Sequence, residues 1–183
     1  MVGRSFLLTV MTLAMSVALH AQPASSEYRI KAVFLFNFVQ FVEWPPDAFA
    51  SSTAPIVICV VGADPFGEAL DQTVEGESID NRRLVVRRME RSDGAETCHL
   101  LFVSRSEQAR LGQILHAIGP SSSVLTVSDI DGFVGRGGAI GFFFDRQRIR
   151  FEISPSQMQR RRLKVSSQLL SLGRIHPPGG RRP

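Results

Sequence analysis

The sequence predicts an α/β fold in which helices cover both faces of a largely parallel sheet and an antiparallel hairpin forms its C-terminal edge. Short apolar runs rich in β-branched residues alternate along the chain with segments of helical periodicity, a pattern typical of β–α–β units. Near the end of the chain, the strand-like runs 139–144 and 149–153 are separated only by a short polar turn over 145–147, which indicates a β-hairpin. The chain has 183 residues, 44% of them hydrophobic, so it has the size and the apolar content of one ordinary domain.

The first residues of the chain have the pattern of a signal peptide. Arg4 precedes an uncharged apolar run that extends to Leu19, and Ala21 supplies the small residue expected at a cleavage site. The alternative is a retained membrane anchor, but the run is shorter than the ~20 residues that a membrane-spanning helix needs. We therefore expect a cleaved signal peptide over residues 1–21, an exported α/β domain over 22–175 and a disordered C-terminal tail over 176–183.

The charge of the chain carries little information about partners. The formal net charge is +4 at pH 7, and removal of Arg4 with the signal peptide lowers it from +4 to +3. A mildly basic balance on an exported protein does not indicate nucleic-acid binding, so we expect no nucleic-acid partner.

Residues 27–42 have the periodicity of a helix that faces the core. Ser25 and Ser26 can cap its start, and a Pro-Pro pair follows its end. Lys31 falls outside the apolar stripe and is therefore expected on the polar side of the helix. The stripe consists of residues at three- and four-residue steps: Ile30, Val33, Phe34, Phe38, Phe41 and Val42.

The remaining elements alternate between strands and helices. Residues 55–62 form a continuous apolar run that suits a strand covered on both faces. Asp64 can cap a short helix whose first position is taken by Pro65. Further strands are expected over 84–86, 98–103 and 124–127, and further helices over 106–118 and over about 155–172.

Cys59 and Cys98 are the two cysteines of the chain. An exported protein enters a compartment in which disulfides form and persist, so a bridge between them is favoured over two separate buried thiols. A closed loop of this length would stabilise the fold by roughly 4 kcal/mol in the chain-entropy model.

The sequence predicts no catalytic residue, metal or cofactor, and therefore a protein that is not an enzyme. It contains no Gly-x-Ser-x-Gly motif, and the pair Ser128 and Asp129 after a strand is more typical of a turn than of a nucleophile and its partner. Cys98 and His99 are neighbours in a predicted strand, so their side chains point to opposite faces of the sheet. The four histidines are scattered and share no ligand spacing with the cysteines.

A glycine-rich run over 135–141 is interpreted as a strand-entry turn. It lacks the order of glycines in a phosphate-binding loop, and it precedes a strand where such loops precede a helix. The exposed amides of Gly137 and Gly138 are nevertheless candidates for contact with a small ligand.

A basic run over 160–164 is interpreted as a solvated charge cluster on the outer side of the last helix. The alternative is that two of these cations on one helix face, Arg162 and Lys164, hold an anionic ligand or an acidic partner.

A series of ordered motifs resembles the YfiR family of periplasmic proteins, and the resemblance covers about residues 27–173. The motifs are Glu27-Tyr28-x-x-Lys31-Ala32-x-Phe34-Leu35-x-Asn37-Phe38-x-x-Phe41-Val42-Glu43-Trp44-Pro45, Gly62-x-Asp64-Pro65-Phe66-Gly67, Cys98-His99-Leu100-Leu101-Phe102, Leu125-Thr126-Val127-Ser128-Asp129, Gly132-Phe133, Gly137-Gly138-x-Ile140, Arg150-Phe151-Glu152-Ile153 and Ser166-Ser167-Gln168-Leu169-Leu170.

The resemblance implies an αβα sandwich that acts in the periplasm and is supported by a disulfide at positions matching Cys59 and Cys98. It implies a repressor of an inner-membrane diguanylate cyclase, acting from the periplasmic side, whose repression an OmpA-like outer-membrane lipoprotein relieves by sequestration. It also implies that the protein can form homodimers.

We therefore expect a repressor that binds the periplasmic region of a diguanylate cyclase or a related sensor, and lowers cyclic di-GMP signalling and biofilm formation. The alternative is a small-molecule binding protein whose ligand enters near the strand ends, with Arg162 and Lys164 as anion contacts.

Overall fold

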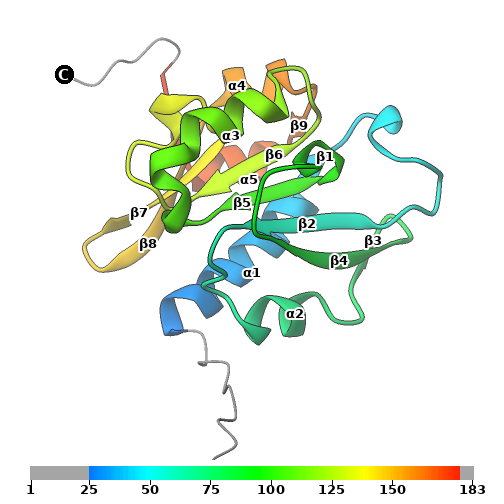
Figure 1. Ribbon diagram of the computed structural model, residues 1–183, viewed down its shortest axis with the longest axis horizontal. Helices are drawn as coiled ribbons and strands as arrows, with labels where there is room; N and C mark the ends of the chain where they lie inside the picture. Colours follow the sequence, from blue (N-terminus) through cyan, green and yellow to red (C-terminus); the bar gives the residue numbers. More distant parts are fainter. Residues whose placement is uncertain (1–24, 178–183) are drawn as a thin grey trace, which may run out of the picture.

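An eight-stranded sheet forms the centre of the protein over residues 25–177, the part of the chain that this computed structural model describes (Figure 1). In spatial order the strands are β10 (Arg174–Ile175), β8 (Arg148–Ile153), β7 (Ile140–Asp145), β6 (Leu125–Ser128), β5 (Leu100–Val103), β2 (Ile56–Val61), β4 (Arg82–Met89) and β3 (Ser78–Ile79). The central strands from β7 to β4 run parallel, whereas β8 is antiparallel to β7 and β3 is antiparallel to β4. The predicted α/β fold with a largely parallel sheet and an antiparallel C-terminal hairpin is confirmed.

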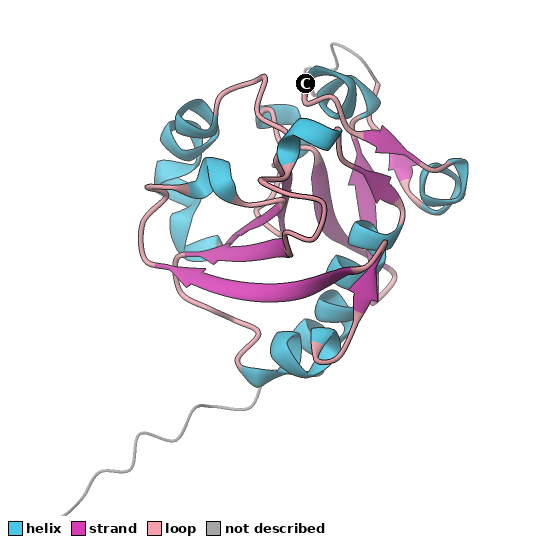
Figure 2. Cartoon of the chain, turned by 90° about the vertical axis from the view of Figure 1, so that its right-hand side faces the viewer, coloured by secondary structure: helices cyan, strands magenta, loops and turns pink. Residues whose placement is uncertain are grey.

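Alternate residues of the central strands contribute to two separate hydrophobic cores. Ile56, Ile58 and Val60 of β2 face one core, and the residues 57, 59 and 61 face the other. The first core contains residues of α1 (Ser26–Gln40), α2 (Glu68–Val74), α4 (Pro155–Arg160) and α5 (Ser167–Leu172), and the second contains residues of α3 (Leu111–Ile118). Helices therefore cover both faces of the sheet, as an αβα sandwich requires (Figures 1 and 2).

The first helix confirms only part of its predicted apolar stripe: Phe38 is buried and Phe34 packs against the first core. Ile30 and Val33, which the stripe assigns to the core, are each 50% exposed, whereas Lys31 is 1% exposed. The buried residues of α1 are Lys31, Ala32, Leu35, Phe38 and Val39. The prediction for Lys31 is wrong because this side chain pairs with Glu27 and with the buried carboxylate of Asp129, which apolar periodicity does not reveal.

The C-terminal segment forms two short helices, so the single helix expected over 155–172 is wrong. Helix α4 ends at Arg160, and Arg162 adopts a left-handed conformation with φ of 57°. The chain then forms β9 (Lys164–Val165), which pairs antiparallel with β1 (Val42–Glu43). Ser166 next caps α5 by accepting a hydrogen bond from the backbone N–H of Leu169. The strand pairing and the cap satisfy backbone groups, so tertiary contacts override the local helical periodicity.

Shorter helical turns complete the described part of the chain. The helix expected over 106–118 begins as a 3₁₀ turn, η3 (Arg105–Arg110), and continues as α3. The other 3₁₀ turns described are η1 (Pro46–Ala48), η2 (Ala95–Thr97) and η4 (Val134–Arg136).

The Cys59–Cys98 disulfide joins β2 to the segment that leads into β5. The two Cα atoms are 6.0 Å apart, and the bridge closes a sequence separation of 39 residues. Both cysteines are buried in the second core. The bridge therefore covalently links two neighbouring parallel strands on the face that α3 covers.

The predicted signal peptide over 1–21 lies outside the described residues, as do residues 178–183 of the predicted tail. The tail's first residue, His176, still donates its backbone N–H to the Ile153 carbonyl at 2.8 Å. Between residues 25 and 177, no helix combines the length and the apolar character needed to cross a membrane.

Candidate functional site

Arg162 and Lys164, the predicted contacts for an anionic ligand or partner, lie after α4 and do not share a helix face. The Arg162 side chain is 54% exposed and its Nη1 lies 2.8 Å from Oδ2 of Asp47. The Lys164 side chain is 85% exposed, and its Nζ is 3.9 Å from Oε2 of Glu43. Both cations face solvent, and their role in binding stays a prediction.

Arg161 does not belong to a solvated charge run, because it is only 2% exposed. Its Nη1 donates to the Gly119 carbonyl at 3.3 Å and to Ser122 Oγ at 3.2 Å. Gly119 follows the last turn of α3, so the guanidinium lies where a helix C-terminus favours a cation. Burial lowers the pKa of Arg161. We assign this residue to the packing of α3 against the C-terminal segment.

Gly137 and Gly138 use their amides within the turn that precedes β7. Gly137 N–H donates to the Val134 carbonyl at 3.1 Å, and Gly138 N–H donates to the Phe133 carbonyl at 3.0 Å. Gly137 has a φ of 103°, which favours glycine. These geometries show a folding role for both glycines, and contact with a ligand stays a prediction.

Replacing Gly138 by alanine should lower the free energy of unfolding by about 1–3 kcal/mol, the usual cost of overpacking. A Cβ at this position would lie 2.1 Å from the Phe133 ring, and Phe133 is 1% exposed and cannot move outward freely. Gly112→Ala within α3 is the matched control, because nothing lies within 4 Å of its Cβ position. That control should be neutral or slightly stabilising in the same denaturant titration. Equal effects of the two variants would contradict the packing role of Gly138.

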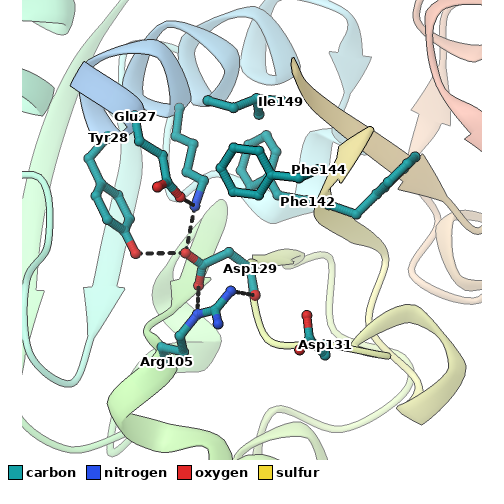
Figure 3. A pocket seen from close by; sticks show the side chains of 10 residues that line it. Glu27, Tyr28, Arg105, Asp129, Asp131, Phe142, Phe144 and Ile149 are labelled. Atoms are coloured by element: carbon teal, nitrogen blue, oxygen red, sulfur yellow. Dashed lines mark hydrogen bonds and ion pairs between the residues drawn. The ribbon is translucent and has the colours of Figure 1, made fainter. Parts of the chain in front are cut away.

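A buried ionic cluster lies beyond the carboxyl ends of β5 and β6 (Figure 3). Asp129 directly follows β6 and is 2% exposed. Its Oδ2 accepts hydrogen bonds from Lys31 Nζ and from the Tyr28 hydroxyl, each at 2.7 Å. Lys31 also pairs with Glu27 one helical turn away. The first turns of α1 are thereby tied to the edge of the sheet where parallel strands present their carboxyl ends.

Arg105 completes the cluster from the segment after β5. Its Nη2 donates to the backbone carbonyl of Asp129 at 2.8 Å, and its Nε lies 3.8 Å from Asp129 Oδ1. That oxygen is buried and has no hydrogen-bond partner among the described residues. A buried acceptor without a donor is uncommon, and it marks this place as one where a water or a ligand group would be stabilised.

Tyr28 acts in this cluster as a fixed hydrogen-bond donor. Burial raises the pKa of the Tyr28 hydroxyl well above its usual range, and its hydrogen bond to Asp129 and the negative charge of Asp129 add to the shift. The hydroxyl therefore stays protonated at physiological pH and keeps its hydrogen on the carboxylate.

A cavity of about 570 Å³ opens beside the cluster. Figure 3 shows the side chains of Phe142, Phe144 and Ile149 on one side of this cavity and Asp129, Asp131 and Arg105 on the other. A volume of this size lies in the range of ~300–1,000 Å³ that is typical of small-molecule sites. The residues that line it are drawn from α1, β7, β8 and the segments after β5 and β6.

The sequence reasoning missed this cluster as a site, although part of its signal was present. Glu27 and Lys31 are four residues apart on the predicted helix, which is the spacing of an ion pair. The interpretation of Asp129 as a turn former left out its role as the carboxylate that Lys31 reaches from 98 residues away. Only the fold brings these residues together.

The residues considered as nucleophiles or bases are engaged in structural contacts. Ser128 Oγ donates to the Val103 carbonyl at 2.7 Å and accepts from the Ile130 N–H at 3.0 Å. His99 Nδ1 accepts the Val57 N–H at 3.0 Å, and its ring stacks on Phe49. Among residues 25–177, no group of three or more His, Cys, Asp or Glu side chains is arranged to hold a metal ion.

His99 should make the stability of the protein fall as the pH drops below about 6.5, the usual histidine pKa. Burial lowers the pKa of His99 in the folded state; the Ala48 carbonyl opposes this shift and the Arg82 charge adds to it. Between the two pKa values the unfolded chain binds a proton that the folded chain does not. The free energy of unfolding therefore falls by at most about 1.4 kcal/mol for each pH unit, until the pH reaches the lowered pKa of the folded state. Denaturant titrations between pH 7.5 and 5 should show this loss for the wild type and a shallower one for His99→Gln. Identical pH profiles of the wild type and His99→Gln would contradict this role of His99.

Comparison with known proteins identifies the family of the chain. No curated protein matches it. The crystal structure of a conserved domain protein from Vibrio cholerae shares its fold with a TM-score of 0.56 at 10% sequence identity, over 83% of this chain and 60% of that chain. The chain thus spans less than two thirds of that protein, and the likeness concerns the fold alone. A family model described as YfiR/HmsC-like matches residues 28–174, which is most of the chain. The protein belongs to the YfiR/HmsC-like family.

Proposed function

We propose that the protein is a periplasmic regulator that binds the periplasmic region of a membrane-bound diguanylate cyclase, or of a related sensor, and represses it. The observation that carries the proposal is the family match over residues 28–174, which contain both hydrophobic cores and nearly all of the sheet. The signal-like N-terminal sequence and the Cys59–Cys98 bridge support a periplasmic location, since disulfides persist in that compartment.

Repression of this kind requires binding and no catalytic step. A regulator shifts a cyclase toward its inactive state only by binding that state more tightly than the active one. An OmpA-like outer-membrane lipoprotein would relieve repression by competing for the regulator, and a homodimer would present two copies of the binding surface. Each of these partners is part of the proposal.

Arg162 and Lys164 are the contacts that we assign to an acidic surface of the partner. Both side chains face solvent next to the β1–β9 pair, and their carboxylate neighbours Asp47 and Glu43 are themselves exposed. Ion pairs this exposed contribute little to folding. Both cations can therefore leave their carboxylate neighbours and bind carboxylates of the partner protein.

The test is co-precipitation of the purified mature protein with each membrane-bound diguanylate cyclase of the native host that carries a periplasmic segment. One cyclase should bind, and its activity in isolated membranes should fall when the protein is added. The variant with Arg162→Glu and Lys164→Glu should bind about tenfold or more weakly, because two charges are reversed at the interface. Arg91→Glu, a single charge reversal at a side chain that is 76% exposed and remote in sequence, is the control for surface charge and should bind like the wild type. Binding to none of these cyclases contradicts the proposal.

A further inference from the structure

The cavity beside the Lys31–Asp129 cluster has an excess of negative charge. Its charged lining residues are Glu27, Lys31, Arg105, Asp129 and Asp131. The two cations are balanced by Glu27 and Asp129, with which they make the contacts described above. Asp131 is the third carboxylate; it is exposed and forms no hydrogen bond or ion pair with any residue of 25–177. One unpaired negative charge therefore remains in the lining.

The two buried hydrogen-bond donors of the cluster, Tyr28 and Lys31, are already committed to its carboxylates. Tyr28 donates its proton to Asp129, and Lys31 donates to Glu27 and Asp129. The buried oxygen without a donor, Asp129 Oδ1, is an acceptor, as is the carboxylate of Asp131. An anion entering the cavity would meet these unpaired acceptors, whereas a cation would be attracted by them.

Aromatic side chains form the opposite wall of the cavity (Figure 3). Phe142 is 5% exposed and belongs to the first core. Phe144 is 56% exposed and does not pack against that core, so packing does not explain why this position is aromatic. Aromatic faces attract organic cations that lie within about 6 Å of the ring centroid. Lys31 Nζ already lies 5.8 Å from the Phe142 ring centroid and 6.0 Å from that of Phe144, so these rings are left to the apolar or aromatic body of a ligand.

We propose that this cavity binds a small organic cation, an ammonium group carried on an apolar or aromatic body. The ammonium pairs with Asp131 on one side, and the body lies against Phe142, Phe144 and Ile149 on the other. The location beyond the carboxyl ends of parallel strands is where open α/β sheets bind ligands. The site lies at the strand ends, as the alternative function predicts, but it takes a cation and uses neither Arg162 nor Lys164. The inference goes beyond the proposed repression and does not depend on it.

Three probes that share one body and differ in charge test the inference by isothermal titration calorimetry on the purified mature protein. They are 2-phenylethylammonium, the neutral 2-phenylethanol and the anionic 3-phenylpropionate. The ammonium should bind with a dissociation constant in the millimolar range or below, and at least about tenfold more tightly than either analogue. Failure of the ammonium to bind, or binding of the alcohol or the anion with equal affinity, overturns the inference.

Substitutions locate the binding in this cavity. Asp131→Asn should weaken ammonium binding about tenfold, and Phe144→Ala should weaken it several-fold, because each removes one side of the proposed contact. Both residues are exposed, so both variants should keep the thermal stability of the wild type. Asp80→Asn is the matched control: it makes the same charge change at an exposed carboxylate with φ of 50°, a conformation that asparagine tolerates. Equal affinity of Asp131→Asn and Asp80→Asn would place the ligand elsewhere and overturn the inference.

Discussion

Replacing Lys31 by alanine should lower the free energy of unfolding by about 3–5 kcal/mol, the usual cost of breaking a buried ion pair by removing one partner. The Lys31 and Asp129 side chains are 1% and 3% exposed, so the substitution leaves a buried carboxylate without its ammonium partner. The substitution also removes a contact between α1 and the sheet edge. Equilibrium unfolding in urea, with the midpoint and slope compared between variants, measures the loss.

Lys164→Ala provides the matched control for Lys31→Ala. The two substitutions remove the same atoms, but the Lys164 side chain is 85% exposed and its nearest carboxylate oxygen is 3.9 Å away. The control should change the free energy of unfolding by less than about 0.5 kcal/mol. A loss of less than about 1 kcal/mol for Lys31→Ala would show that the cluster does not hold α1 in place.

Loss of the Cys59–Cys98 bridge should cost about 4 kcal/mol, within the 2–5 kcal/mol typical of small secreted domains. The estimate follows from the sequence separation of 39 residues, which sets the loop entropy that the bridge removes from the unfolded chain. Because both positions are buried, alanine is a better replacement than serine, whose hydroxyl would lack a partner. Urea titrations of the wild type and of the Cys59→Ala/Cys98→Ala variant measure the loss.

Reductant supplies the control for the bridge. The wild type should move to a lower urea midpoint when a reductant is added, whereas the variant without cysteines should not change. Periplasmic material should also be lighter than its reduced form by about two hydrogens, as one disulfide requires. Equal urea midpoints with and without reductant would contradict a stabilising role for the bridge.

The fold was predictable because its main signals are local. The apolar runs that became β2, β5 and β6 are continuous, and these strands are buried on both faces. The hairpin between β7 and β8 followed from a short polar turn, in which Arg146 and Gln147 take the positive φ angles of a two-residue connection. The C-terminal segment was not predictable in this way, because its division into α4 and α5 depends on pairing with β1 across the molecule.

The candidate site was much less predictable than the fold. Lys31 falls outside the apolar stripe of the first helix, and such a residue is usually placed on the solvent side. Its burial depends on Asp129, which the sequence places directly after a strand but gives no reason to pair with the first helix. Arg161 and Arg162 are adjacent in the chain, yet one is buried against α3 and the other is exposed next to Asp47. A charge run in a sequence does not distinguish these environments.

Repression of a diguanylate cyclase is tested most directly by the cellular concentration of cyclic di-GMP in the native host. Deleting the gene should raise that concentration, and a plasmid copy of the wild-type gene should restore it. The rise should vanish when the cognate cyclase is also deleted, because a regulator acts only through its differential affinity for the states of that enzyme. An unchanged concentration after clean deletion, under conditions in which the wild-type strain is shown to produce the protein, would contradict repression.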